Sequence, residues 1–248
     1  MDPLVLLFLA AAGLFAGFVD AVAGGGGLVA LPVLLSVGIP PVSALATNKF
    51  QGATGTAMAA FTYWHGGYVE LRKLLFAIVG TFAGAYLGAM LVRQIDTGVL
   101  QVLVPVALIA IAIYFMFAPQ LDNDSRAARL SMPLFAPVAG FLIGFYDGVF
   151  GPGTGSFFTI VFISLFGMGV VRASAHTKML NLTSNLAALV LFIPAGNVVW
   201  PAAIAMGLGQ LAGGFLGAKT GIRFGAKFIK PLVVLVSVAM AARLLLAR

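Results

Sequence analysis

The chain of 248 residues contains no cysteine and only two histidines. Disulfides, thiolate zinc sites and thiol catalysis are therefore excluded, and a transition-metal centre has little support. Charged residues make up only 8% of the chain, whereas hydrophobic residues make up 61%. A soluble domain of this size needs far more polar side chains to cover its surface, so the composition predicts a polytopic membrane protein.

Other absences narrow the function further. The chain contains no Gly-Lys-Ser/Thr sequence of a nucleotide-binding loop, so ATP drive within this chain is not expected. The net charge is +7, but the basic residues are scattered over short segments, which indicates membrane orientation rather than nucleic-acid binding. We expect no cofactor, no resident metal and no enzymatic activity.

Long apolar runs fill the chain from end to end, with room for roughly eight to ten spans of ~20 residues. In the first half the expected helical segments are Leu4–Val22, Leu28–Val37, Ser43–Trp64, Leu74–Val92 and Val99–Phe117. In the second half they are Leu134–Phe150, Phe157–Phe166, Ala173–Ile193, Ala203–Gly221 and Pro231–Leu246. The second segment of each half is too short to cross a bilayer and follows a run of glycines, which is typical of a broken helix.

The two halves repeat the same features at nearly constant spacing. Asp147 follows Asp20 by 127 positions, and Lys178 follows Lys49 by 129. A glycine ladder at positions 80, 84 and 88 returns at 209, 213 and 217 and predicts close helix packing. We therefore expect an all-α integral membrane protein built as one domain from two repeats, 1–118 and 132–248, of about five helical segments each, joined by a cytoplasmic linker, 119–131.

The distribution of basic residues predicts that the repeats have opposite orientations. Placing the loop before Leu74, the linker and the loop after Gly221 in the cytoplasm puts most loop lysines and arginines inside. The loop Pro194–Trp200, which matches the first of these, then lies outside, as do Arg93 and Arg172. Such an inverted repeat is a common plan of secondary transporters. Five crossings per half, or three crossings and a re-entrant hairpin, both satisfy it.

Each glycine run is preceded by an acidic residue within apolar sequence. A backbone break at Gly24–Gly27 and at Gly151–Gly155 would expose amide donors, and the N-terminus of a helix attracts anions. Gly25, Gly26, Gly153 and Thr154 are therefore candidate substrate contacts. Asp20 and Asp147 either carry a coupling proton or cap the break by accepting backbone hydrogen bonds, because an acid within a span needs a partner or a proton.

Each lysine lies in a short polar string within an otherwise apolar segment. The candidate substrate-binding residues there are Thr47, Asn48, Lys49, Gln51, His176, Thr177, Lys178, Asn181 and Asn185. A lysine with amide and hydroxyl neighbours suits a small oxyanion, but each lysine can instead pair with an acid or extend to the membrane surface. His176 fits either a proton relay or a buried histidine with ordinary hydrogen bonds.

These motifs resemble a known family. The strings GFVDAVAGGGGL and ALATNK in the first half, and GFYDGVFGPGTG and AHTKMLN in the second, are similar to those of the sulfite exporter family, also called TauE/SafE, and most of all to its YfcA-like branch. The resemblance covers Leu4–Leu246. It implies export of a small organic or inorganic sulfur anion across the bacterial inner membrane, with Asn48, Lys49, Lys178 and Asn181 in the family's polar strings.

The sequence thus favours a secondary transporter that exports a small anion, such as a sulfite-like or organosulfur oxyanion, by alternating access, with proton coupling as one option. The alternatives are a passive anion channel and a membrane protein with a structural role only. The expected partners are the anion and the lipid bilayer of the inner membrane, with no nucleic acid. Association into a homo-oligomer is compatible with the sequence.

Overall fold

The computed structural model describes residues 1–96, 98–104, 106, 110 and 128–225. The described residues form α-helices joined by turns, and no strand occurs among them. Three of these helices are long and apolar enough to cross a membrane, namely Pro3–Ala23, Leu71–Val92 and Trp200–Phe224. The prediction of an all-α membrane protein is confirmed. The expected segment Pro231–Leu246 and most of Val99–Phe117 lie outside the described residues.

The helices lie where the apolar runs predict them, and their ends differ by a few residues. They are α1 (Pro3–Ala23), α2 (Gly26–Ser36), α3 (Pro41–His65), α4 (Leu71–Val92), α6 (Met132–Val149), α7 (Thr154–Ser164), α8 (Val170–Phe192) and α9 (Trp200–Phe224). Several begin with proline in the first turn, where a backbone N–H would have no partner within the helix, so proline loses no hydrogen bond there. As expected, α2 and α7 are short, with 11 residues each.

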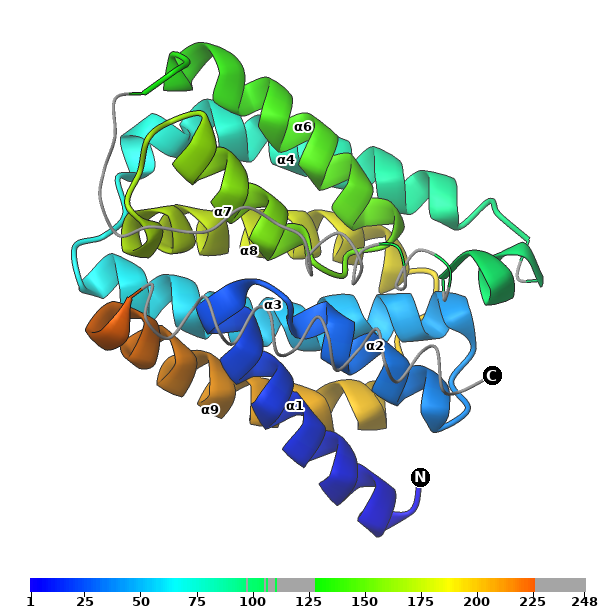
Figure 1. The fold of residues 1–248 in the computed structure, drawn as a ribbon. Helices are drawn as coiled ribbons and strands as arrows, with labels where there is room; N and C mark the ends of the chain where they lie inside the picture. The colour runs from blue at the N-terminus through cyan, green and yellow to red at the C-terminus, as the bar shows by residue number, and fades with distance from the viewer. Residues whose placement is uncertain (97, 105, 107–109, 111–127, 226–248) are drawn as a thin grey trace.

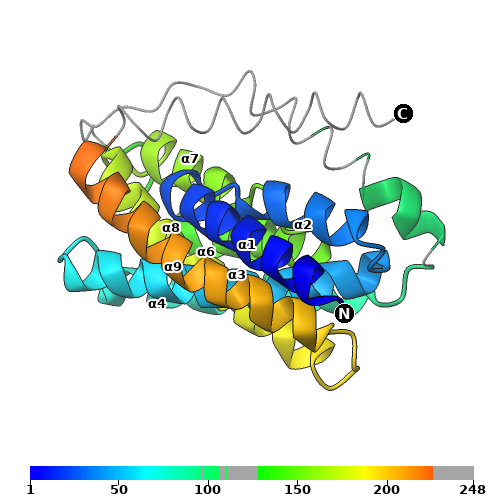
Figure 2. The same cartoon turned by 90° about the horizontal axis from the view of Figure 1, so that it is seen from below.

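The bundle has α3 and α8 at its centre, with the pair α1 and α9 on one side and the pair α4 and α6 on the other (Figure 1). The view turned by 90° shows the same long helices running side by side (Figure 2). The short helices α2 and α7 pack against α3 and α8, respectively. Because α3 and α8 are covered on both sides, the polar strings that they carry are buried in the interior.

The glycine ladders bring each outer pair of helices into backbone contact. A Cβ atom at Gly209 or Gly213 of α9 would lie 2.0 Å from a backbone oxygen of α1. A Cβ at Gly84 of α4 would lie 2.1 Å from the oxygen of Phe141 in α6, and one at Gly88 would lie 2.2 Å from that of Phe145. Small residues drive such packing in membranes because the apolar lipid provides no hydrophobic force between helices. Each ladder therefore joins a helix of the first half to one of the second.

The central helices α3 and α8 run in opposite directions. Thr47, near the start of α3, accepts a hydrogen bond of 3.0 Å from the backbone N–H of Val199, which follows α8. Glu70, which follows α3, contacts Arg172 in the first turn of α8 at 3.4 Å. The turn after α3 and the turn after α8 therefore lie at opposite ends of the bundle, as the distribution of basic residues predicted.

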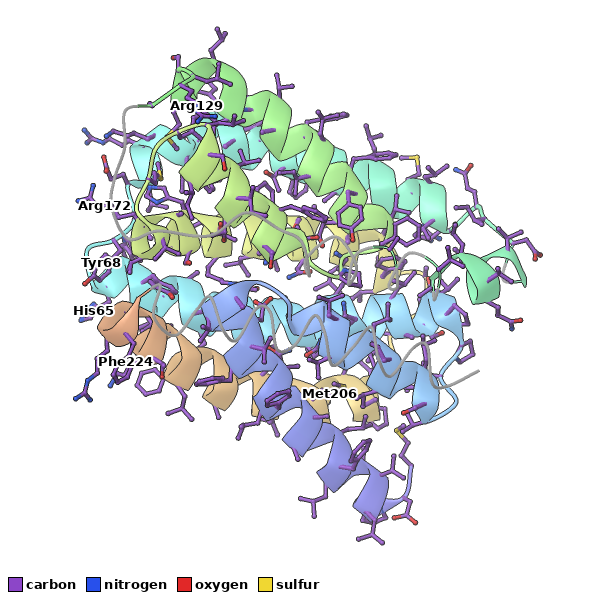
Figure 3. All side chains as sticks on the ribbon, viewed as in Figure 1. His65, Tyr68, Arg129, Arg172, Met206 and Phe224 are labelled. Atoms are coloured by element: carbon purple, nitrogen blue, oxygen red, sulfur yellow. The ribbon has the colours of Figure 1, made fainter. Side chains whose placement is uncertain are left out.

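One end of the bundle gathers basic residues. Figure 3 shows Arg129, Arg172 and His65 near the same end, where α9 also finishes at Phe224. Arg72 and Lys73 lie there too, because they directly follow Glu70. The prediction that Arg172 lies on the opposite side of the membrane from the loop before Leu74 was wrong, because Arg172 contacts Glu70 of that loop. The helices α6 and α7 form a hairpin in which the backbone N–H of Arg129, before α6, bonds the oxygen of Leu165, after α7. The hairpin of α6 and α7 thus begins and finishes at the same end of the bundle, so α8 begins at the basic end. Arg93 caps the other end of α4.

We expect the basic end to face the cytoplasm. Because the chain has no native cysteine, single cysteines can be introduced at exposed His65 and at exposed Ala195 and probed with a membrane-impermeant thiol reagent. His65→Cys should react only from the cytoplasmic side and Ala195→Cys only from the opposite side. Labelling of both variants from one side would contradict the arrangement of α3 and α8.

Candidate functional site

The two glycine breaks meet at the centre of the bundle. Gly24 has a φ of 77° and ends α1, and Gly153 has a φ of 81° and precedes α7. A Cβ atom at Gly24 would lie 2.3 Å from the carbonyl carbon of Gly155, and one at Gly155 would lie 2.5 Å from the Cα of Gly24. Gly27 similarly faces the backbone of Pro152. The two breaks are therefore in direct backbone contact, which only glycine permits.

Each acid binds the first turn of the helix that follows its own break. Oδ1 of Asp20 accepts a hydrogen bond of 3.3 Å from the backbone N–H of Gly26, at the start of α2. Oδ1 of Asp147 accepts one of 2.7 Å from the hydroxyl of Thr154, at the start of α7. Both carboxylates thus hold the direction in which the chain leaves the break.

Each lysine pairs with the acid of the other half of the chain. Lys49 Nζ of α3 lies 2.8 Å from Oδ1 of Asp147 in α6, and Lys178 Nζ of α8 lies 3.2 Å from Oδ2 of Asp20 in α1. Both lysine side chains are 1% exposed. An unpaired charge would be very costly at such burial, so the two pairs cross-link the halves where the breaks meet.

The two ion pairs differ in how many bonds they make. Lys178 Nζ donates both to the main-chain oxygen of Asp20 and to its carboxylate. Lys49 Nζ contacts only Oδ1 of Asp147, at 2.8 Å, and has no other polar partner among the described residues. Oδ2 of Asp147 likewise has no hydrogen-bond partner in the described part of the chain. Lys178 thus makes two hydrogen bonds to Asp20, whereas in the Lys49 pair Nζ and Oδ2 of Asp147 still have room for a further partner.

A small polar cavity of about 30 Å³ lies between the breaks, enough for one or two water molecules. Both carboxylates line it, while neither lysine is among its described lining residues. The other lining residues are Gly24, Gly26, Gly27, Asn48, Gln51, Gly52, Thr56, Gly151, Gly155, Asn181, Asn185 and Gln210.

Several residues from the predicted set lie outside this lining. Thr47 bonds Val199, and the hydroxyl of Thr177 lies 3.1 Å from that of Thr159 in α7. Gly25 and Gly153 cap the short helices, and Thr154 holds Asp147. These residues hold neighbouring helices and turns together, and none of them lines the cavity.

His176 lies near the basic end of α8, away from the cavity. Its Nδ1 is 2.7 Å from the oxygen of Arg172, and its Nε2 accepts the backbone N–H of Glu70 at 3.3 Å. Both ring nitrogens are therefore used in tying α8 to the turn after α3. A hydrogen bond from Lys73 holds the pKa of the Glu70 carboxyl below its usual range, which keeps this acid charged beside Arg172.

The sequence left two features of the site open. It gave each lysine an acid as one option but did not say which acid, because the crossed pairing depends on how the halves pack. It also placed Gln210 within a glycine ladder, where its side chain could face the cavity, without deciding whether it does. Gln210 lines the cavity because α9 packs against α3 through Gly55, next to which its side chain lies. Among the described residues no cluster of His, Asp and Glu could hold a metal ion.

Comparison with known proteins identifies the family. The family model described as "Sulfite exporter TauE/SafE" matches residues 9–244. The chain belongs to this family. This TauE/SafE protein is 46% identical to the "Probable membrane transporter protein ORF9" of a Sinorhizobium species, over 97% of this chain and 92% of the relative. It is 40% identical to the "Probable membrane transporter protein" of Haemophilus influenzae, over 98% and 95% of the two chains.

The probable membrane transporter protein YfcA of Escherichia coli K12 is also 40% identical, over 99% of this chain and 91% of the relative. No solved structure matches the chain significantly. Family and relatives indicate that this TauE/SafE member is a membrane transporter and not an enzyme. The inner membrane is the location expected of a bacterial transporter.

Proposed function

We propose that this TauE/SafE member is a secondary carrier that exports a small oxyanion such as sulfite, bound at the cavity where the two breaks meet. The observation that carries the proposal is the pair of crossed Lys–Asp contacts beside that cavity. Two buried lysines, the buried Asp147 and the partly buried Asp20 give a neutral site. An anion that enters this neutral site needs a positive charge to pair with. One of the lysines can become its partner if the acid of that lysine is neutralised at the same time.

Protonation of Asp147 would provide that charge. A neutral Asp147 no longer compensates Lys49, so the ammonium group becomes free to bind the anion in its place. Adding one proton and one monovalent anion, such as hydrogen sulfite, together leaves the site neutral, which matters because an uncompensated buried charge costs about 3–5 kcal/mol. The unpartnered Oδ2 of Asp147 is the atom that would take the proton. Because Lys178 is held by two acceptors, it serves to fix the end of α1 instead.

The arrangement favours a carrier over a channel. The cavity is small, and the backbone contact between Gly24 and Gly155 forms part of its lining. The halves also contribute matching parts with opposite helix directions, as in the inverted repeats that let transporters rock around a fixed central site. We infer that the two repeats, 1–118 and 132–248, move against each other about this contact. The anion is named as sulfite-like because the family model carries that description.

The test is flux in proteoliposomes with a sulfite gradient and an internal pH dye. Wild type should show saturable sulfite movement, accompanied by protons moving in the same direction. In Asp147→Asn the amide mimics the protonated acid, so sulfite movement should persist while proton movement disappears. When the anion and the proton leave together, as proposed for wild type, the outward concentration gradient of the anion drives export.

Asp20→Asn serves as the matched control, because Asp20 already holds Lys178 through two hydrogen bonds. It should lower thermal stability, since it weakens the bonds that hold Lys178 and Gly26, but proton movement should remain. Flux that rises without saturation would favour a channel. Proton movement equal to wild type in a folded Asp147→Asn protein would rule out this acid as the coupling group.

A further inference from the structure

A second hollow lies far from the central cavity, at the basic end of the bundle. It is a groove of about 710 Å³ between the C-terminal halves of α3 and α9. Its apolar wall includes Phe61, Phe215 and Leu216, all well exposed on the outer surface of the helices. Its basic groups are His65, Lys219 and Arg223, and no acidic residue is among the described residues that line it.

The two cations of the groove rest on aromatic rings. Lys219 Nζ lies 4.4 Å from the centre of the Phe215 ring, and the guanidinium carbon of Arg223 lies 5.2 Å from that of Phe224. Neither forms an ion pair with an acid in the described part of the chain. Two basic groups above an exposed apolar groove therefore have no acidic partner among the residues that the structure describes. Figure 3 shows His65 and Phe224 close together at this end.

The opposite end of the bundle offers a natural comparison. A cavity of about 440 Å³ lies there, lined by the turn from Leu35 to Pro41 and by Leu100, Gln101 and Val104. It is also largely apolar, but none of its described lining residues is charged. The two hollows thus share their apolar character and differ in positive charge.

We propose that the groove between α3 and α9 binds one anionic phospholipid, with its phosphate between Lys219 and Arg223 and an acyl chain along Phe61, Phe215 and Leu216. The charge of the lining selects an anionic headgroup, and the apolar wall selects a lipid over a soluble phosphate. Basic pockets between helices at the cytoplasmic side of membrane proteins suit such headgroups. This site is independent of the proposed transport function.

The experiment is lipid titration of the purified full-length protein in nonionic detergent, followed by native mass spectrometry. Wild type should retain phosphatidylglycerol in clear preference to phosphatidylcholine. A basic residue near an anionic headgroup contributes about fivefold in affinity, so Lys219→Gln with Arg223→Gln should reduce phosphatidylglycerol binding by roughly 25-fold. Glycerol phosphate should not compete at equal concentration, because it has no acyl chain.

Arg93→Gln is the matched control, since it removes an exposed arginine at the opposite end. It should leave the preference unchanged. Equal retention of the two lipids by wild type would overturn the proposal. A preference that survives in the Lys219→Gln and Arg223→Gln protein would also overturn it, as would full competition by glycerol phosphate.

Discussion

Removing the charge of Lys49 should strongly weaken anion binding, whereas removing that of Lys178 should mainly weaken the fold. Lys49 Nζ has donors to spare beside the cavity, and Lys178 Nζ is occupied by two acceptors of Asp20. A hydrogen bond to a charged group contributes about 1.5–3 kcal/mol, so Lys49→Met should lower sulfite affinity by roughly 10- to 150-fold. Calorimetry on the purified proteins measures this loss.

Each single substitution leaves a buried acid without its partner, which costs about 3–5 kcal/mol and could unfold the protein. The neutral double variants avoid this problem. Lys49→Met with Asp147→Asn should fold and fail to bind sulfite, and Lys178→Met with Asp20→Asn should bind it with near wild-type affinity. If the first double variant binds as tightly as wild type, Lys49 is only a salt-bridge partner and the anion site lies elsewhere.

Gly24→Ala should be the most destabilising single change in the glycine breaks. The added Cβ would lie 2.3 Å from the backbone of Gly155, and the φ of 77° is unfavourable for any residue with a side chain. Neither backbone can move without shifting a helix, so the cost should exceed the roughly 1–3 kcal/mol of ordinary overpacking. Thermal unfolding in detergent, followed through Trp64 and Trp200, should show a large drop in midpoint and a loss of sulfite flux.

The neighbouring glycine is the control. Gly25 has a φ of −111°, and the nearest atom to an added Cβ is a leucine methyl at 3.5 Å. Gly25→Ala should therefore unfold close to the wild-type midpoint. Equal midpoints for Gly24→Ala and Gly25→Ala would show that the backbone contact between the two breaks does not limit stability.

The sequence by itself determined the class of the protein and the parts of its site. Sparse charge and continuous apolar runs place the chain in a membrane, because they leave too few polar side chains to cover a soluble surface. The apolar runs are then expected to be helices, because a helix satisfies its backbone hydrogen bonds internally and unsatisfied polar groups are too costly in lipid. The short helices α2 and α7 were predictable because Gly24–Gly27 and Gly151–Gly155 interrupt the runs locally. Asp20, Lys49, Asp147 and Lys178 could be singled out because a charge inside a span needs a local reason.

Only the tertiary structure decided how these parts combine. Residues such as Lys49 and Asp147 are nearly a hundred positions apart, and no local pattern states which acid a lysine meets. The crossed pairing follows from the glycine ladders, which join α1 to α9 and α4 to α6 and so place each acid against the other half. The same packing turns His176 toward Glu70 and brings Gln210 to the cavity, because a side chain's surroundings depend on neighbouring helices as well as its own.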